Sequence, residues 1–485
     1  MLSSGVARRA WLAKGTVATI HPPTRLLRGP LTVAFLCFAC GLPAWGQVDV
    51  SRDLETIRVN RHMPGIAAMA IKDGHIVAQG AAGYRRQGDS TPLLVTDPFN
   101  LGSCTKWMTA TLAGRLVDRG IIGWNTRVCE VFTNYPAFNT AFVNATLDQL
   151  LCHRAGVEDQ NTFDAAHWTA FMPQTGTVAH LRRWVSDTVL KDAPQVPPGS
   201  YLYANQGYTV AATMLEIASG KDWETLIQEE LFTPLRMKTA MLGQVFGNAR
   251  PPAAPVGHDL VGGTNPVPRL KLPLNFEWHY KASLGAAGYV GCTLQDWAKF
   301  LYMHTTNCIS DYMTTATGSR LQTPYIDTHG NDYGRGIVVG YRTWADGNAL
   351  FHGGDVFGQD SQVFMAPMKK FIAVVGINCS SGTNPAVANA LNDVATLLVV
   401  GYTNAPAVGP LLEEPAAASL DVGDQVALDY FTLPGLAYTV ETATNLTGRW
   451  TPVDSTKSRA ATSLRSIYTE TDSAPVKFYR VRIAP

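Results

Sequence analysis

Residues 103–120 read SCTKWMTATLAGRLVDRG, and this stretch decides which kind of domain the chain forms. Its apolar residues recur at the spacing of one helix face, and Gly120 follows the last of them. The pattern therefore predicts an amphipathic helix from Ser103 to Arg119. At its start, Ser103 is the one serine in the chain that is followed three residues later by a lysine, Lys106.

A serine and a lysine at this spacing can form a nucleophile and its base. The unpaired backbone N–H groups at a helix start favour a developing anion beside Ser103. A residue three positions further lies on the same face one turn along, so Lys106 can reach the serine hydroxyl. A desolvated lysine has a lowered pKa and can accept a proton. The alternative is that Ser103 is only a helix N-cap and Lys106 a solvated first-turn residue.

The surrounding pattern predicts an α+β domain. Residues 65–71 and 75–79 form two apolar runs joined by Asp73-Gly74, which indicates a β-hairpin. Residues 361–365 and 371–377 read as a second hairpin near the other end of the domain. Helical periodicity lies between the hairpins, at 103–119, 209–217, 223–231 and 294–304. We therefore expect the domain to open with paired strands and its terminal strands to share one sheet.

Two further short motifs carry polar side chains suited to a site. Tyr203-Ala204-Asn205 follows a Pro-Pro-Gly turn and precedes a helical run, which is a loop position able to present side chains. The same Tyr-x-Asn pattern recurs at 402–404, where a structural role is favoured. His352-Gly353-Gly354 precedes the second hairpin, and paired glycines on a strand allow close approach to the backbone.

Taken in order, Ser103-x-x-Lys106, Tyr203-x-Asn205 and His352-x-Gly354 resemble the three signature motifs of the serine β-lactamase-like hydrolases. That family comprises class C β-lactamases, D-alanyl-D-alanine carboxypeptidases, D-aminopeptidases and related esterases. The resemblance covers roughly residues 53–401 and implies an antiparallel sheet flanked by helices, with an inserted all-helical region. Neighbouring segments match as well, namely 97–99 (DPF), 150–156 (LLCHRAG), 286–288 (AAG) and Asn378 at the end of a strand.

The resemblance implies acyl transfer to a serine. Ser103 would attack a carbonyl, and Lys106 and Tyr203 would move its proton as a coupled base and acid. Asn205 would orient the lysine and the substrate amide. The backbone N–H groups of Ser103 and Asp355 would form the oxyanion hole, and water would hydrolyse the acyl-enzyme.

The third motif departs from that of β-lactamases proper, which usually carry lysine at its first position. His352 has an unperturbed pKa of about 6.5 and would attract a substrate carboxylate less strongly. This favours an ester or peptide substrate over a β-lactam. Together with Gly354, His352 is assigned to substrate binding.

Asp355 is a second departure from the family pattern, because a carboxylate beside an oxyanion opposes catalysis unless its side chain turns away. Cys104 is read as a small buried residue.

Composition excludes several classes of protein. The chain has 485 residues, of which 46% are hydrophobic and 16% charged, so it is not a disordered polymer. A net charge of +1 without a basic, aromatic-rich run argues against nucleic acid as a partner. The six cysteines after residue 46 contain no C-x-x-C, and the histidines contain no H-x-H or H-E-x-x-H, so the sequence supports no metal site or other cofactor.

Residues 1–46 are predicted to be a secretory signal peptide. They hold five basic residues and no acid, followed by an apolar run from 31 to 42 that is too short to span a bilayer. No later run approaches membrane-spanning length. The protein is therefore expected to be exported, either to the periplasm or to the medium.

Three segments are expected after the signal. Residues 47–404 form the hydrolase domain, 405–418 a linker rich in proline and alanine, and 419–485 a small β-sandwich-like module resembling those at the ends of secreted bacterial proteins. The expected function is that of an exported serine hydrolase acting on a small ester, peptide or β-lactam. Two alternatives remain, a catalytically silent binding or sensor protein on the same fold, and a cell-surface or cell-wall attachment role centred on the terminal module.

Overall fold

The structure is a computed structural model, and it divides into two compact units after Glu413. The predicted signal peptide, residues 1–46, lies outside the described residues. The residues described are 47–158, 165–243, 252–269, 282–305, 312–325, 332–380, 382, 385–413, 417–419, 425–443, 451–453, 459–460, 465–471 and 478–483.

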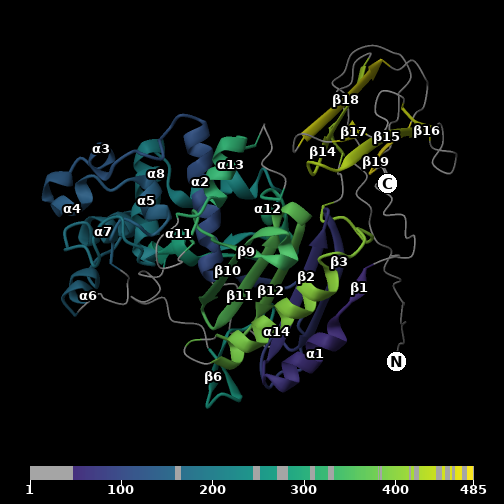
Figure 1. Ribbon diagram of the computed structural model, residues 1–485, viewed down its shortest axis with the longest axis horizontal. Coiled ribbons are helices and arrows are strands. Elements are labelled where there is room, and N and C mark those ends of the chain that lie inside the picture. Colours follow the sequence, from purple (N-terminus) through teal and green to yellow (C-terminus); the bar gives the residue numbers. More distant parts are fainter. Residues whose placement is uncertain are drawn as a thin grey trace, which may run out of the picture. The chain divides into compact units, whose positions relative to one another are not determined.

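The larger unit is built on a seven-stranded sheet of order β1-β3-β2-β12-β11-β10-β9 (Figure 1). Every neighbouring pair is antiparallel except the short β1, which runs parallel to β3. The hairpin at the start of the domain pairs with the hairpin at its end through β2 and β12, as the sequence predicts. The strands are β1 (Val48–Asp49), β2 (Gly65–Lys72), β3 (His75–Gly83), β9 (Val338–Arg342), β10 (Gly347–Val356), β11 (Gln359–Ala366) and β12 (Phe371–Ile377).

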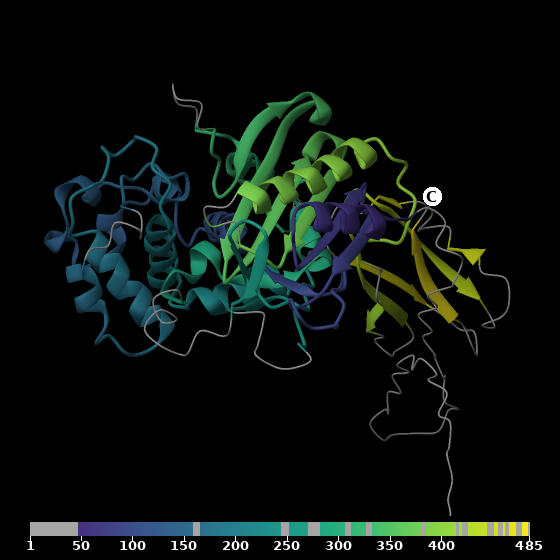
Figure 2. The ribbon, with the colours of Figure 1, turned by 90° about the horizontal axis from the view of Figure 1, so that it is seen from below.

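Two helices from opposite ends of the domain cover one face of this sheet. They are α1 (Ser51–Asn60) and α14 (Pro385–Tyr402), which lie side by side on it (Figures 1 and 2). Alternate residues of β2 point toward them, because successive side chains of a strand face opposite sides. Ile66, Ala68 and Ala70 are fully buried in one core with Leu391, Val394 and Leu398 of α14.

Neither of these helices was predicted from the sequence. The prediction that the domain opens with paired strands was wrong, since β1 and α1 precede the hairpin. The second helix of the sequence pattern also begins earlier than expected, because α8 spans Asn205–Ser219 and includes Gly207. A side chain at Gly207 would meet the Leu150 carbonyl oxygen at 3.4 Å, an ordinary van der Waals distance, so packing does not require glycine inside this helix.

The chain between β3 and β9 supplies the opposite face and a helical region to one side (Figure 1). The predicted helix at residues 103–119 is present as a 3-10 turn, η1 (Gly102–Cys104), followed by α2 (Thr105–Asp118). The remaining helices are α3 (Val128–Val131), η2 (Tyr135–Ala137), α4 (Thr140–Val143), α5 (Leu147–Leu151), α6 (Ala165–Phe171), α7 (Val178–Val189), α9 (Trp223–Ile227), the π-helical turn η4 (Gln228–Phe232), α11 (Gly285–Gly288), α12 (Leu294–Tyr302), α13 (Thr315–Gln322), η5 (Thr343–Ala345) and η6 (Pro367–Lys369). The short strands are β4 (Pro98–Asn100), β5 (Met241–Leu242), β6 (His258–Val261), β7 (Asn265–Pro268) and β8 (Val290–Thr293).

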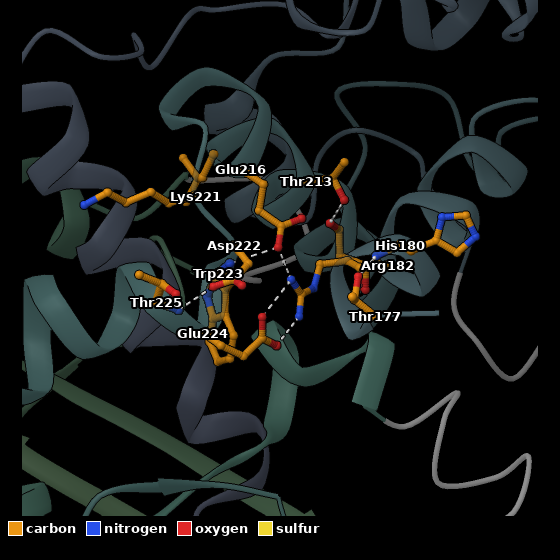
Figure 3. A network of polar contacts seen from close by, with 12 residues as sticks. Thr177, His180, Arg182, Thr213, Glu216, Lys221, Asp222, Trp223, Glu224 and Thr225 are labelled. Carbon is orange, nitrogen blue, oxygen red and sulfur yellow. Dashed lines mark hydrogen bonds and ion pairs between the residues drawn. The ribbon is translucent and has the colours of Figure 1, made fainter. Parts of the chain in front are cut away.

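A buried ion cluster joins three helices of this region (Figure 3). Arg182 of α7 is fully buried, and its guanidinium pairs with Glu216 of α8 and Glu224 of α9. Glu216 also accepts the Trp223 backbone N–H at 2.9 Å. A buried guanidinium requires such partners, since an unpaired charge is costly to desolvate. The cluster therefore fixes the direction of α8, whose first residue is Asn205.

The segment 405–413, predicted as the first part of a linker, belongs to the larger unit. The Pro410 carbonyl accepts the Ile76 N–H at 2.8 Å, and the Leu412 N–H donates to the Gly74 carbonyl at 2.9 Å. Leu412 is fully buried. Glu413 forms an ion pair of 2.5 Å with the buried Lys299 of α12.

The smaller unit contains two antiparallel sheets. One has the order β13-β14-β18, and in the other β15 pairs with β16, β17 and β19. The Tyr430 and Tyr438 rings, from β14 and β15, lie 6.3 Å apart, and the Leu433 N–H donates to the Tyr438 hydroxyl. The strands are β13 (Ala417–Ser419), β14 (Gln425–Phe431), β15 (Ala437–Ala443), β16 (Thr451–Pro452), β17 (Arg459–Ala460), β18 (Arg465–Thr471) and β19 (Phe478–Ile483).

Among the residues that the structure describes, no helix combines the length and apolar character needed to cross a membrane.

Candidate active site

The Ser103 turn is held between a short strand and the main sheet. Ser103 lies in η1 and is partly buried. The Asn100 N–H of β4, just before this turn, donates to the Gln359 side chain of β11 at 2.8 Å. Thr105, just after it, accepts the Val290 N–H of β8 at 3.1 Å. Bonds on both sides thus fix the turn that presents the serine.

Lys106 is fully buried, and its ammonium has three acceptors. Nζ donates to Ser103 Oγ at 2.9 Å, to Asn205 Oδ1 at 2.6 Å and to the Ala287 carbonyl at 2.9 Å. An ammonium has three N–H donors, and a buried one is costly unless each is paired. The lysine therefore joins the first and second predicted motifs at one atom.

Tyr203 lies beside this ammonium. Lys106 Nζ is 4.8 Å from the centre of the Tyr203 ring and 5.6 Å from that of Tyr208. Tyr203 precedes α8 by two residues, so the predicted loop position is correct, and Asn205 is the first residue of that helix. The Tyr203 ring also faces His352, at 6.3 Å between ring centroids.

His352 is buried in β10 with both ring nitrogens engaged. Nδ1 lies 2.6 Å from the Gly353 carbonyl, and Nε2 lies 3.0 Å from the Tyr333 hydroxyl. A carbonyl can only accept, so Nδ1 carries the proton and Nε2 accepts from Tyr333. Burial, with the nearby Lys106 charge, lowers the pKa of His352 to about 4. The ring is therefore neutral at physiological pH, as the sequence argument expects.

Two glycines bring β10 against the serine turn. A Cβ at Gly354 would stand 2.0 Å from the Leu101 carbonyl oxygen and 2.7 Å from the Ser103 nitrogen. A Cβ at Gly102, whose φ is +50°, would stand 2.6 Å from the Asp355 nitrogen. Only glycine tolerates such contact. The backbone N–H groups of Ser103 and Asp355 accordingly lie on the two sides of one close contact.

The Asp355 carboxylate points away from that contact. It accepts the Ser380 hydroxyl at 2.7 Å on each oxygen and the Gly382 N–H at 3.1 Å. Side chains alternate along a strand, so Asp355 faces the side of β10 opposite to His352. The bonds to Ser380 and Gly382 hold this side chain turned away from the oxyanion site, which is the orientation that catalysis requires.

All seven residues predicted from the sequence therefore belong to one neighbourhood, with Asp355 contributing its backbone. The sequence argument did not assign Tyr333 or His153 to the site. Tyr333 begins a Tyr-Gly-x-Gly segment, and a Cβ at its second glycine, Gly336, would stand 2.6 Å from the Lys106 carbonyl oxygen. Closely spaced glycines near an aromatic residue could have identified this segment. His153 lies in the matching segment 150–156, and no role was predicted for it.

One further group of side chains has the chemistry of metal ligands. Within the described residues, Glu158, His167 and Asp192 place ligand atoms within 4.8 Å of one another. His167 Nε2 lies 2.9 Å from Asp192 Oδ2, which an ordinary ion pair or hydrogen bond explains. None of the three is among the predicted site residues.

Comparisons with known proteins agree with this geometry. Penicillin-binding protein 4 of Amycolatopsis lactamdurans is 27% identical over 189 residues, 39% of this chain and 47% of that protein. The D-alanyl-D-alanine-carboxypeptidase/endopeptidase AmpH of Escherichia coli K12 is 28% identical over 177 residues, 35% of this chain and 43% of that protein. The matched part thus spans about half the length of these curated relatives.

A solved structure shows the same fold. EstCE1, described as a hydrolase with promiscuous acyltransferase activity, superposes with a TM-score of 0.58 at 15% identity, covering 71% of this chain and 97% of its own. The sequence model of the beta-lactamase family matches residues 50–398, which is most of the larger unit. With the first two motifs joined at Lys106 and His352 of the third motif facing Tyr203, the chain belongs to the beta-lactamase family.

Proposed function

We propose that the chain is a serine hydrolase that forms an acyl-enzyme on Ser103. The observation that carries the proposal is the position of the buried Lys106 Nζ, 2.9 Å from Ser103 Oγ and 2.6 Å from Asn205 Oδ1. No packing requirement explains a buried lysine joined to a partly exposed serine, whereas proton transfer from the serine does. The names of AmpH and EstCE1 support a hydrolytic reaction on this fold.

The proposed reaction has two steps. In the reactive form Lys106 is a neutral amine, whose two N–H groups donate to Asn205 Oδ1 and the Ala287 carbonyl and whose lone pair faces Ser103 Oγ. It accepts the Ser103 proton while Oγ forms a bond to the substrate carbonyl carbon. The N–H groups of Ser103 and Asp355 stabilise the oxyanion. The bond to the leaving alcohol or amine then breaks, and that group leaves with the proton, relayed through Tyr203. Water, deprotonated by the same pair, attacks the acyl carbon and restores Ser103.

The proposed substrate is an ester or amide in preference to a β-lactam. The third motif presents a neutral His352, whose pKa is lowered to about 4, so it supplies no charge to hold a substrate carboxylate at neutral pH. The silent-sensor alternative depended on an obstructive Asp355. Because that carboxylate bonds Ser380, no observation favours the alternative.

The test is covalent labelling combined with a substrate panel. A fluorophosphonate probe should label the wild-type protein and should not label Ser103→Ala. Short-chain p-nitrophenyl esters and D-alanyl-D-alanine peptides should be turned over faster than nitrocefin. An unlabelled but folded wild type would refute the hydrolase proposal, and faster nitrocefin hydrolysis would refute the substrate preference.

We also propose that the protein is exported, with cleavage before Gln47. The support is the sequence of residues 1–46, basic at first and then apolar. Expression of the full chain in a bacterial host, followed by N-terminal sequencing of the periplasmic fraction, tests this. An intact N-terminus retained in the cytoplasm would contradict it.

A further inference from the structure

His153 contacts the backbone on both sides of Tyr203. The Leu202 N–H donates to the His153 carbonyl at 2.9 Å, and the Ala204 N–H donates to His153 Nδ1 at 3.1 Å. One residue therefore binds the backbone N–H groups of Leu202 and Ala204, the residues on either side of the tyrosine. No other described side chain bonds the Ala204 N–H, so its acceptor is supplied by the histidine ring.

The His153 ring also packs against Tyr203 itself. The two ring centroids are 4.4 Å apart, the shortest of several aromatic contacts that this histidine makes. Tyr333 and Tyr208 lie at 4.8 and 5.3 Å on its other sides. His153 is only 3% exposed, so this packing leaves it little freedom to move. The ring thus forms a rigid support for the tyrosine beside Lys106.

The hydrogen bond to Ala204 defines the charge state of His153. Because Nδ1 accepts the hydrogen bond from the Ala204 N–H, the ring proton is on Nε2 and the imidazole is neutral. Burial, followed by the charges of Lys106 and His352, holds the pKa of His153 well below its usual value. The ring is consequently a constant acceptor for Ala204 across the physiological pH range.

Stability alone does not account for a histidine here. Its Nε2 is buried and has no hydrogen-bond partner among the described residues, which disfavours folding. Its φ is +60°, a backbone conformation that is uncommon for residues other than glycine, although histidine adopts it more often than most. An apolar residue or a glycine would avoid one or both of these penalties. The position is therefore explained better by what the ring does for Tyr203.

We infer that His153 is a positioning residue for Tyr203. By fixing the peptide groups on both sides of the tyrosine and supporting its ring, it keeps the phenol beside Lys106 and Ser103. This inference rests on the proposed hydrolase function, in which Tyr203 relays the serine proton.

Two substitutions distinguish the hydrogen-bond acceptor of His153 from the volume of its side chain. His153→Asn keeps an acceptor oxygen at the position of Nδ1 and tolerates a positive φ, whereas His153→Leu keeps the volume and removes the acceptor. With a p-nitrophenyl ester, we expect His153→Leu to lower kcat about 100-fold with little change in KM, the effect of misplacing a reacting group by about 1 Å. His153→Asn should recover most of this loss. If His153→Leu does not fold, His153→Gly, which relieves the positive φ, replaces it.

A readout independent of activity separates this inference from the proposed function. With 3-fluorotyrosine at position 203, the ¹⁹F resonance should be a single sharp line in the wild type and in His153→Asn. It should broaden or split in His153→Leu. If the wild type hydrolyses nothing while these spectra differ as expected, the hydrolase proposal fails and the positioning stands.

His304 provides a matched control, because it is also buried and neutral but packs against Trp107 and Phe300. His304→Leu should leave kcat and the ¹⁹F line of residue 203 unchanged. Wild-type kcat in a folded His153→Leu or His153→Gly protein would overturn the inference. So would equal losses in the Asn and Leu variants with an unchanged ¹⁹F line.

Discussion

Lys106 Nζ lies 2.9 Å from Ser103 Oγ although the lysine side chain is fully buried. The two residues are three positions apart on the segment that passes from η1 into α2, so the helix itself sets their spacing. The remaining donors of the ammonium are taken by Asn205 and Ala287. A local sequence feature therefore supplies the pair, and distant segments fix its geometry.

Replacing this lysine should abolish the reaction without unfolding the protein. We expect Lys106→Met to lower kcat/KM for a p-nitrophenyl ester about 1,000-fold or more, since positioned acid–base groups contribute factors of 10² to 10⁴. Lys299 is a matched control, being a buried lysine bonded to Asp296 on α12. Lys299→Met should lower the melting temperature but leave kcat/KM of the folded fraction near the wild-type value. Equal activity losses in both variants would contradict the assignment.

Replacement by alanine should have very different effects at the two glycines of the third motif. Gly354→Ala places a Cβ 2.0 Å from the Leu101 carbonyl oxygen, so β10 must shift away from Ser103. At Gly353 the nearest atom is the Ser361 carbonyl oxygen at 4.0 Å, and a Cβ fits. We expect kcat to fall about 100-fold in Gly354→Ala, because the oxyanion donors separate. Gly353→Ala should stay within a factor of about three of wild type. Steady-state kinetics on both variants would refute this if their ranking were reversed.

The Asp355 carboxylate should matter little for the chemical step. It bonds Ser380 and Gly382 on the side of β10 away from Ser103, and the proposed oxyanion donor is its backbone N–H. Asp355→Asn keeps the shape and should change kcat less than about threefold, as expected for a group without direct contact with the reacting atoms. Ser380→Ala tests the same contact from its partner. A tenfold gain or loss of kcat in Asp355→Asn would show that the carboxylate acts on the oxyanion.

Acid should destabilise the larger unit through its buried histidines. Burial lowers the pKa of His258 and His352 to about 4 and that of His304 to about 3, from 6.5. The unfolded chain binds these protons below pH 6.5 and the folded protein does not, so stability is complete above pH 6.5 and is lost as pH falls toward 4. Each histidine lowers the free energy of unfolding by up to about 1.4 kcal/mol for each unit by which the pH falls in this range.

Glu216 acts in the opposite direction over part of this range. Burial raises its pKa from 4.5 to about 7, so the folded protein retains that proton and gains stability as pH falls from 7 to 4.5. One carboxyl offsets one histidine, and the net trend remains acid destabilisation. Urea unfolding at pH 7, 6 and 5 measures the slope, and His304→Leu should flatten it by about 1.4 kcal/mol per pH unit. Constant or rising stability toward pH 5 would contradict the prediction.

The end of the larger unit can be located by truncation. A chain ending at Glu413 keeps the buried Leu412 and the Glu413–Lys299 ion pair, whereas one ending at Asn404 loses both. Burying a leucine side chain stabilises by about 2 kcal/mol, so the shorter chain should be less stable by at least that amount. The chain that ends at Glu413 should retain ester hydrolysis. Thermal denaturation of the two proteins would refute this if their melting temperatures coincided.

Much of the fold was predictable because its signals are local. The Asp73-Gly74 turn, the short apolar runs of the hairpins and the helical period after Ser103 each reflect the backbone geometry of a few neighbouring residues. Helix α14 was missed although its signal is also local, because its buried residues from Val387 to Val399 recur at helical spacing. The 405–413 segment has no period at all, and only its contacts with β3 and α12 hold it in place.

By itself the sequence determined which residues could act, since Ser103, Lys106, Tyr203, Asn205 and His352 stand in motifs whose order is linear information. Only the tertiary structure decided how they meet. Asn205 and Ala287 lie 99 and 181 positions from Lys106 in the sequence, yet both bond its side chain, because sheet pairing and helix packing close loops that no local rule predicts. The direction of the Asp355 carboxylate and the support of Tyr203 by His153 likewise depend on partners distant in sequence.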